Sequence, residues 1–261
     1  MKEKWAFLPL FLFALLSLAR TGHASDYQPL VTDVTPVSFS VAWVSGVDST
    51  GSINVFLDRD GINQASDLSL YFQPVLGVDN NVGILAATKG VLKVRVSGLS
   101  PRTSYYFQTV TELKDTGERI LYPAAPPYLE VKTQDMVVRR RGSVPFSNDL
   151  IAMEAYRPGT IFPFEEGLVV VSVEGAAYPV SAFIGDGIPA PWALLDLNNL
   201  FKYEESRTLS LSGGKILSTK FLAPGGMYQG NVFRVYNSSH LGDIKEHLPI
   251  YGDFVGRYGV D

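Results

Sequence analysis

A group of acidic residues near position 60 has the side chains of a calcium-binding loop. Three carboxylates are available, at Asp58, Asp60 and Asp67, and Gly61 follows where such a loop makes its sharp turn. In this alignment the first ligand position falls on Phe56, which cannot ligate, and the twelfth is an Asp where a bidentate Glu is preferred. The same residues suit a polar turn with Gly61 at positive φ. We expect the turn, with calcium at Asp58, Asp60 and Asp67 as the alternative.

Residues that support acid–base catalysis or zinc binding are scarce in the chain. His23 lies near the N-terminus, and the other two histidines, His240 and His247, lie near the C-terminus. A zinc site or a Ser-His-Asp triad between these ends would need a histidine that is missing there. Adjacent carboxylates such as Glu165-Glu166 point to opposite faces of a strand, so they make no glycosidase pair by themselves. A pair assembled from distant positions remains open.

Cysteine is absent from the sequence. Disulfide bonds, thiolate metal sites and thiol nucleophiles are therefore excluded, and the fold depends on its hydrophobic core for stability. We predict a protein with no catalytic residues and no enzyme activity. We also predict no cofactor, apart from the alternative calcium ion.

Aromatic residues offer a different chemistry, the stacking of sugar rings. Tyr105 and Tyr106 are consecutive in an alternating segment, so one of them must face outward. Tyr71, Phe72, Tyr106 and Tyr128 together would expose an aromatic strip of the kind on which glycans stack. Plain packing within the sheets is the alternative, because aromatic residues are common in strands.

The elements that position these residues are strands. Phe39, Val41 and Trp43 alternate with small or polar residues, which is the period of a strand with one apolar face. The segment 92–97 repeats the pattern, with Lys93 and Arg95 predicted to face water. Turn residues separate further segments of this kind up to about residue 134, and no helical pattern of ten or more residues occurs among them.

Two sequence motifs in this region resemble those of fibronectin type III domains. Residues Thr35-Pro-Val-Ser-Phe-Ser-Val-Ala-Trp43 resemble the first core strands of that family. Leu99-x-Pro101-x-Thr103-x-Tyr105 resembles the entry to its sixth strand. The resemblance covers about residues 26–134, and such domains occur in bacterial exported and surface proteins. It implies that Trp43, Leu99 and Tyr105 belong to the core, with the Tyr105 hydroxyl bonded to upstream backbone.

The segment from Asp58 to Gly90 is longer than the corresponding connection of the family. We expect an extra strand within it, at Leu68–Gln73. A second unit follows from residue 148 to 238, and it resembles only loosely the small all-β modules of bacterial surface proteins. Its nearly continuous apolar run Leu168–Val173 suits a strand buried on both faces. Further strands are expected at Trp192–Leu197, at Val232–Val235 and in a hairpin that joins Leu209–Leu211 to Ile216–Leu222 through Gly213-Gly214.

The N-terminus has the features of a signal peptide. Lys2 and Lys4 precede an apolar run from Ala6 to Ala19, and Gly22-His-Ala24 supplies small residues for cleavage after Ala24. A retained anchor is the alternative, but the run is shorter than the roughly 20 residues that span a bilayer. Cleavage would leave 19 basic and 25 acidic side chains, a net charge of −6. This acidic balance argues against nucleic acid as a partner.

The sequence thus predicts an all-β chain with two β-sandwich-like domains in tandem, the first fibronectin type III-like (immunoglobulin-like). The expected parts are a signal peptide (1–24), the first sandwich (26–134), a solvated linker (135–147), the second all-β domain (148–238) and a C-terminal tail (239–261).

The predicted function is that of an exported, non-catalytic binding or structural module. Its expected location is secreted, periplasmic or on the surface of a bacterial cell. Adhesion, surface assembly and spacing are the roles expected of such a module, and its partners would be other exported proteins or glycans. After cleavage no integral membrane segment is expected. The alternative is a carbohydrate-binding accessory protein or a weak glycan-active enzyme that uses a groove between the domains.

Overall fold

The structure is a computed structural model of the 261-residue chain. It describes residues 28–72, 82–136, 150–156, 165–186, 192–196, 215–235 and 247–251. The expected signal peptide and nearly all of the expected linker lie outside the described residues. Strands make up most of the described residues, which confirms the all-β prediction, and no described helix is long and apolar enough to cross a membrane.

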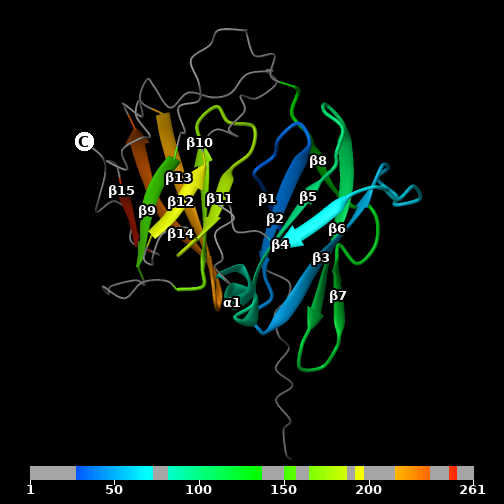
Figure 1. Cartoon of the computed structure of the whole chain (residues 1–261), viewed down its shortest axis with the longest axis horizontal. Coiled ribbons are helices and arrows are strands. Elements are labelled where there is room, and N and C mark those ends of the chain that lie inside the picture. The colour runs from blue at the N-terminus through cyan, green and yellow to red at the C-terminus, as the bar shows by residue number, and fades with distance from the viewer. Residues whose placement is uncertain are drawn as a thin grey trace, which may run out of the picture.

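The N-terminal unit contains two sheets (Figure 1). The first has the order β1 (Leu30–Thr32), β2 (Ser38–Val44), β5 (Val91–Ser97), β4 (Ser69–Phe72). The second has the order β3 (Ser49–Phe56), β6 (Ser104–Leu113), β7 (Arg119–Tyr122), and β8 (Leu129–Lys132) pairs with the first half of β6. All these pairings are antiparallel. Strand β4 confirms the extra strand expected at Leu68–Gln73.

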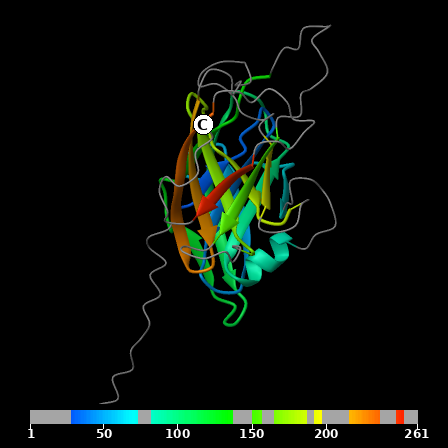
Figure 2. The same cartoon turned by 90° about the vertical axis from the view of Figure 1, so that its left-hand side faces the viewer.

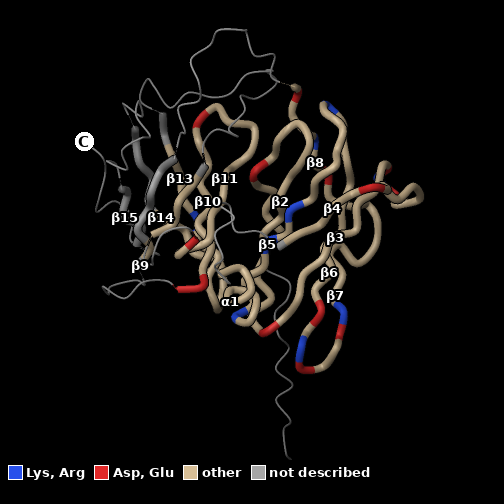
Figure 3. Tube along the Cα trace, viewed as in Figure 1, with Lys and Arg blue, Asp and Glu red and all other residues tan. Residues whose placement is uncertain are grey.

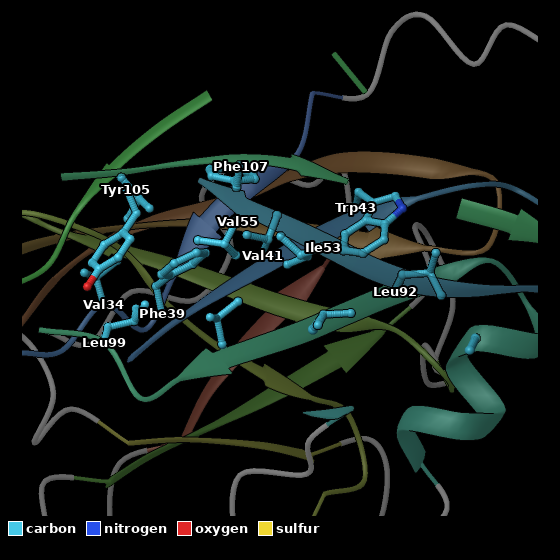
Figure 4. Packing of buried hydrophobic residues seen from close by; sticks show 14 residues of the cluster. Val34, Phe39, Val41, Trp43, Ile53, Val55, Leu92, Leu99, Tyr105 and Phe107 are labelled. Carbon is cyan, nitrogen blue, oxygen red and sulfur yellow. The ribbon is translucent and has the colours of Figure 1, made fainter. Parts of the chain in front are cut away.

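These two sheets pack face to face around one apolar core (Figure 4). Alternation places Phe39, Val41 and Trp43 of β2 on the inner face, opposite Phe107 of β6. The Phe39 and Phe107 rings, one from each sheet, have centroids 5.7 Å apart. The core extends from Tyr105 at one end to Trp43 at the other, so both residues are held in one interior.

The second unit also contains two sheets. One has the order β11 (Val180–Phe183), β10 (Leu168–Val173), β13 (Lys215–Ala223), β14 (Gly226–Val235). The other has the order β12 (Trp192–Asp196), β9 (Leu150–Tyr156), β15 (His247–Tyr251). Buried residues from β9 to β13 join the two sheets in a second apolar cluster, which includes Val169, Val171, Leu195 and Phe221.

Three features of the structure go beyond the sequence predictions. The first strand and the Gly213-Gly214 turn of the predicted hairpin lie outside the described residues, while its second strand lies within β13, which forms a further hairpin with β14 through Pro224-Gly225. The predicted tail contributes β15, which pairs in parallel with β9. A short helix, α1 (Val82–Thr88), precedes β5. Seven residues are too few for a periodic helical pattern to stand out, and a parallel partner distant in sequence leaves no turn signal.

The two units pack sheet against sheet, and a third apolar cluster fills the interface between them. Ala42 and Val91 from the outer face of the β2–β5 sheet meet Leu168, Val170 and Phe183 of the second unit. In Figure 2 the strands of the second unit accordingly overlie those of the first. The described sheets therefore form four stacked layers. This arrangement buries both faces of β10, as its continuous apolar run predicts.

The prediction that Lys93 faces water is wrong. Its side chain points away from the N-terminal core, as alternation requires, but that outer face is covered by the second unit, and Lys93 is only 2% exposed. Sequence periodicity assigns Lys93 to a face of the sheet. Whether another sheet covers that face depends on residues about ninety positions later.

Candidate functional site

The interface between the two units contains a buried cluster of polar side chains, Thr32, Asp33, Lys93 and Ser181, which we call the polar cluster. The Lys93 Nζ atom lies 2.9 Å from the Asp33 Oδ2 atom and donates a hydrogen bond of 3.0 Å to the Ser181 carbonyl oxygen. The Ser181 N–H and hydroxyl donate to the two oxygens of the Asp33 carboxylate, at 2.9 and 2.8 Å. The Asp33 carboxylate thus accepts hydrogen bonds from Ser181 and faces a positive charge, while the Lys93 ammonium group contacts two oxygen acceptors.

Local geometry brings Asp33 to this position. It follows β1 with a φ of +53°, and its N–H donates to the Pro179 carbonyl oxygen just before β11. The Thr32 hydroxyl lies 2.9 Å from the Ser181 hydroxyl. The end of β1 is therefore attached to β11 of the second unit by backbone and side chains together.

The electrostatics of the polar cluster favour the ionised Asp33. Burial alone would raise the pKa of its carboxyl group, but the positive charge and hydrogen bond of Lys93 and the hydrogen bonds of Ser181 outweigh that effect. The pKa of Asp33 consequently lies below its ordinary value of 3.8. Removal of either partner from a buried pair of this kind leaves an unpaired buried charge, so the polar cluster depends on the two units staying in this arrangement.

Trp43, Leu99 and Tyr105 lie in the core of the N-terminal unit, each 5% exposed. The Tyr105 hydroxyl accepts a hydrogen bond of 2.9 Å from the Ser100 N–H, five residues upstream. The Trp43 Nε1 donates to the Thr111 hydroxyl at 2.9 Å. Its ring lies so close to Gly51 that a Cβ atom there would approach within 2.7 Å. These residues support the scaffold.

The acidic residues considered for calcium form the expected polar turn. The Asp58 carboxylate accepts hydrogen bonds from the Ile62 and Asn63 N–H groups, at 2.9 and 2.7 Å. The Ile62 N–H bond in particular holds the pKa of Asp58 below its usual value. Gly61 has a φ of +73°. Among the described residues no group of three or more His, Cys, Asp or Glu side chains lies close enough together to hold a metal ion, so Asp58, Asp60 and Asp67 do not converge.

The predicted aromatic strip is divided between two sheets. Tyr71 and Phe72 belong to β4, in the sheet that faces the second unit, and the Tyr71 hydroxyl is hydrogen-bonded to that of Ser97. Tyr106 lies on β6 in the other sheet, and Tyr128 lies just before β8, which pairs with β6. The strip of four residues is thus not formed, but Tyr106 and Tyr128 share the outer region of one sheet.

Phe56 joins these two tyrosines, and the sequence analysis did not identify it as a site residue. It lies opposite Tyr106 in the β3–β6 pair, and its ring stacks on that of Tyr128 with centroids 4.7 Å apart. Next along the same pair, the Asn54 side chain donates to the Gln108 side chain at 3.0 Å. All three aromatic rings are half-buried. Alternation with Ile53 and Val55 could have identified Asn54 and Phe56 as outward-facing; their partners depend on strand register.

The outer face of this sheet thus carries stacked rings beside a pair of side-chain amides. We call Asn54, Phe56, Tyr106, Gln108 and Tyr128 the aromatic–amide face. Flat rings stack on the apolar faces of sugars, while amides and hydroxyls donate and accept the hydrogen bonds that sugar hydroxyls require. No protein-family model matches the sequence, and the search of curated proteins gave no match.

Proposed function

We propose that the chain is an exported, non-catalytic binding or structural module of the bacterial cell envelope, with a role in adhesion, surface assembly or spacing. The observation that carries this proposal is the sheet-against-sheet interface between the two units, in which an apolar cluster and the polar cluster hold them in one orientation. A module of this construction keeps its outer faces, strand edges and loops at constant separations. Such constancy is what a spacer or an assembly component needs.

We further propose that the N-terminal unit is a fibronectin type III-like domain. The strand order β1-β2-β5-β4 facing β3-β6-β7 supports an immunoglobulin-like sandwich, the architecture that fibronectin type III domains share, because such sandwiches place their first, second, fifth and fourth strands in one sheet. The Tyr105 hydroxyl, bonded to the Ser100 N–H, has the geometry of a tyrosine corner.

Export can be tested by expressing the full chain in a bacterium and separating cytoplasm, periplasm and medium. We expect the protein outside the cytoplasm, with a mass that shows removal of residues 1–24. A matched variant, Leu16→Arg, places a charge in the apolar run and should keep the protein inside at full length. A wild-type protein that stays in the cytoplasm with its N-terminus intact would contradict the proposal.

Glycan binding is the second candidate function, and the aromatic–amide face is the observation that favours it. The stacked Phe56 and Tyr128 rings are half-buried at this face, and beside them the Asn54 amide is held at a set position by Gln108. Gln108 itself is only 4% exposed and donates to the Pro123 carbonyl oxygen, so it positions Asn54 from below. The space between the two units is filled by side chains. This candidate therefore relies on the outer face of the β3–β6 sheet.

A glycan array probed with the mature protein tests the second candidate. We expect Phe56→Ala to abolish the signal, because it removes one of the stacked rings. Leu121→Ala, which truncates an exposed side chain on β7 of the same sheet, should leave it unchanged. An array without signal for the wild-type protein would remove glycan binding as a function of this face.

A further inference from the structure

Strand β4 has the composition of a strand that pairs with another chain. It is the terminal strand of its sheet, and within the part of the chain that the structure describes it pairs only with β5. The surrounding sequence Leu68-Ser-Leu-Tyr-Phe-Gln73 contains no charged residue, no proline and no glycine. An edge strand exposes a row of backbone N–H and C=O groups, and short uncharged segments with high strand propensity readily extend a sheet through them.

The other edges of the N-terminal unit are charged, short or partly paired. Strands β7 and β8 carry charges, and β1 is only three residues long. Strand β3 is uncharged, but its end is covered by the segment 63–65, where the Ala65 N–H donates to the Val55 carbonyl oxygen. Arg119 begins β7, and β8 contains Glu130 and Lys132. Figure 3 shows charged residues along the β6–β7 hairpin, whereas β4 has none. Leu70 and Tyr71 are nevertheless 43% and 38% exposed. The apolar side chains on β4 are thus left open at an edge that lacks the usual protection.

The loop before β4 adds apolar surface on the same side of the molecule. Leu57 is 54% exposed and Ile62 is 81% exposed. The loop projects at the end of the molecule away from the second unit (Figure 1). It is a defined turn, because the Asp58 carboxylate binds two of its N–H groups and the Leu57 N–H donates to the Asn63 carbonyl oxygen. Its apolar side chains are therefore held outward in a constant arrangement.

We propose that β4 pairs antiparallel with β4 of a second copy of this chain, joining two β1-β2-β5-β4 sheets into one continuous sheet. A second copy fits because a two-fold axis brings each residue against an identical strand, and an uncharged strand meets its copy without repulsion. The charged edges at β7 and β8 offer no such match. The pairing rests on the proposed role in surface assembly and gives that role a specific contact.

Sedimentation velocity over a concentration series tests the pairing with the mature chain. We expect a reversible dimer in the wild type. In Leu70→Lys and in Ser69→Lys, which place like charges at the joined edge, the dimer should weaken by about tenfold or more. Leu121→Lys, a matched change at 40% exposure on the β7 edge, should dimerise as the wild type does. Because the altered side chains are exposed, the thermal melts of all variants should match.

The absence of cysteine permits a second, geometric measurement. A spin label on Ser69→Cys, at the proposed junction, should report a much shorter distance between protomers than a label on Lys132→Cys, in the opposite sheet. A monomeric wild type at every concentration overturns the pairing, as does a dimer that Leu70→Lys leaves intact or a junction distance no shorter than the control. Export measured by fractionation is independent of all three results, so failure of the pairing is distinguishable from failure of the proposed function.

Discussion

Individual side chains in this protein are stabilised by partners that lie both near and far in the sequence. Tyr105 binds the backbone only five residues upstream, within the turn that leads into its own strand. Lys93 and Asp33 meet across sixty residues, and they need Ser181 of the second unit to complete their hydrogen bonds. The first kind of contact can be expected from a motif, whereas the second depends on the packing of whole sheets.

Removal of the Tyr105 hydroxyl should destabilise the protein measurably. In Tyr105→Phe the Ser100 N–H loses its acceptor while the ring still fills the core, so we expect a loss of about 1 kcal/mol in the free energy of unfolding. Urea denaturation monitored by tryptophan fluorescence measures it as a lower midpoint with an unchanged slope. The neighbouring substitution Tyr106→Phe, on the outward face, should change the free energy by less than about 0.5 kcal/mol. Identical midpoints for Tyr105→Phe and wild type would contradict this role.

The polar cluster should make stability sensitive to acid. Because the pKa of Asp33 is lowered by folding, its stabilising effect is complete above the ordinary value of 3.8 and is lost as the pH falls through the lower, folded value. At neutral pH, Asp33→Asn leaves Lys93 without its counter-charge and should cost about 3–5 kcal/mol. We expect this difference from the wild type to shrink below about pH 4, where the unfolded chain takes up a proton at Asp33, and to be lost once the native carboxylate is protonated at lower pH.

Chemical denaturation at a series of pH values measures that difference. Asp115→Asn, on the exposed turn between β6 and β7, is the control and should follow the wild type throughout. A difference between wild type and Asp33→Asn that stays constant from neutral to acid pH would show that ionisation of Asp33 does not contribute.

Among the strands, β10 occupies a special position because it contributes to two cores. Leu168 and Val170 face the N-terminal unit, while Val169, Val171 and Val173 face the β9–β12–β15 sheet. Strand β5 has a similar position in the first unit, but its outer face contains Lys93 and Arg95 among apolar residues. A nearly continuous apolar run such as Leu168–Val171 indicates burial on both faces, whereas a mixed strand such as β5 does not.

Truncation on either side of the β10–β13 sheet should be equally costly. We expect Leu168→Ala, at the interface between units, and Leu217→Ala, in the core of the second unit, each to lower the free energy of unfolding by about 2–5 kcal/mol. Leu121→Ala, 40% exposed, should stay within about 0.5 kcal/mol of the wild type. Equilibrium urea unfolding provides all three values. A Leu168→Ala variant as stable as Leu121→Ala would mean that the interface face is open to water in solution.

At the scale of the whole molecule, the four stacked sheets should behave as one cooperative unit. The apolar interface and the polar cluster connect the units at several points, so unfolding one would expose the buried face of the other. We expect a single calorimetric transition in which the calorimetric and van't Hoff enthalpies agree.

A charge placed in the interface should separate the two transitions. Val170→Asp puts a carboxylate among apolar residues at a position that is 2% exposed in the wild type. Differential scanning calorimetry should then resolve two events at lower temperature. Ile84→Asp, 61% exposed on α1, should preserve the single transition. Two resolved transitions in the wild type would show that the units unfold independently.

Part of the aromatic–amide face can be predicted from the sequence. Alternation forces one of the adjacent residues Tyr105 and Tyr106 outward, so Tyr106 is predictable from the sequence, and Tyr128 belongs to the same predicted strip. Tyr71 and Phe72 were grouped with them, although β4 pairs with β5 in the other sheet. Phe56 was missed because its contact with Tyr128 depends on strand register and on the path of the chain between β7 and β8, and neither leaves a pattern in the sequence.

The amino-acid sequence by itself determined the all-β character, most strand positions and the turns around Gly61 and Leu99–Tyr105. These features follow from the two-residue period of strands and from the backbone preferences of glycine, proline and aspartate, which act over a few residues. Only the tertiary structure decided that Lys93 is buried against Asp33 and Ser181, and that β15 lies parallel to β9. Those outcomes depend on which sheet faces cover one another, and hydrophobic burial is non-directional, so short-range patterns do not specify the partner.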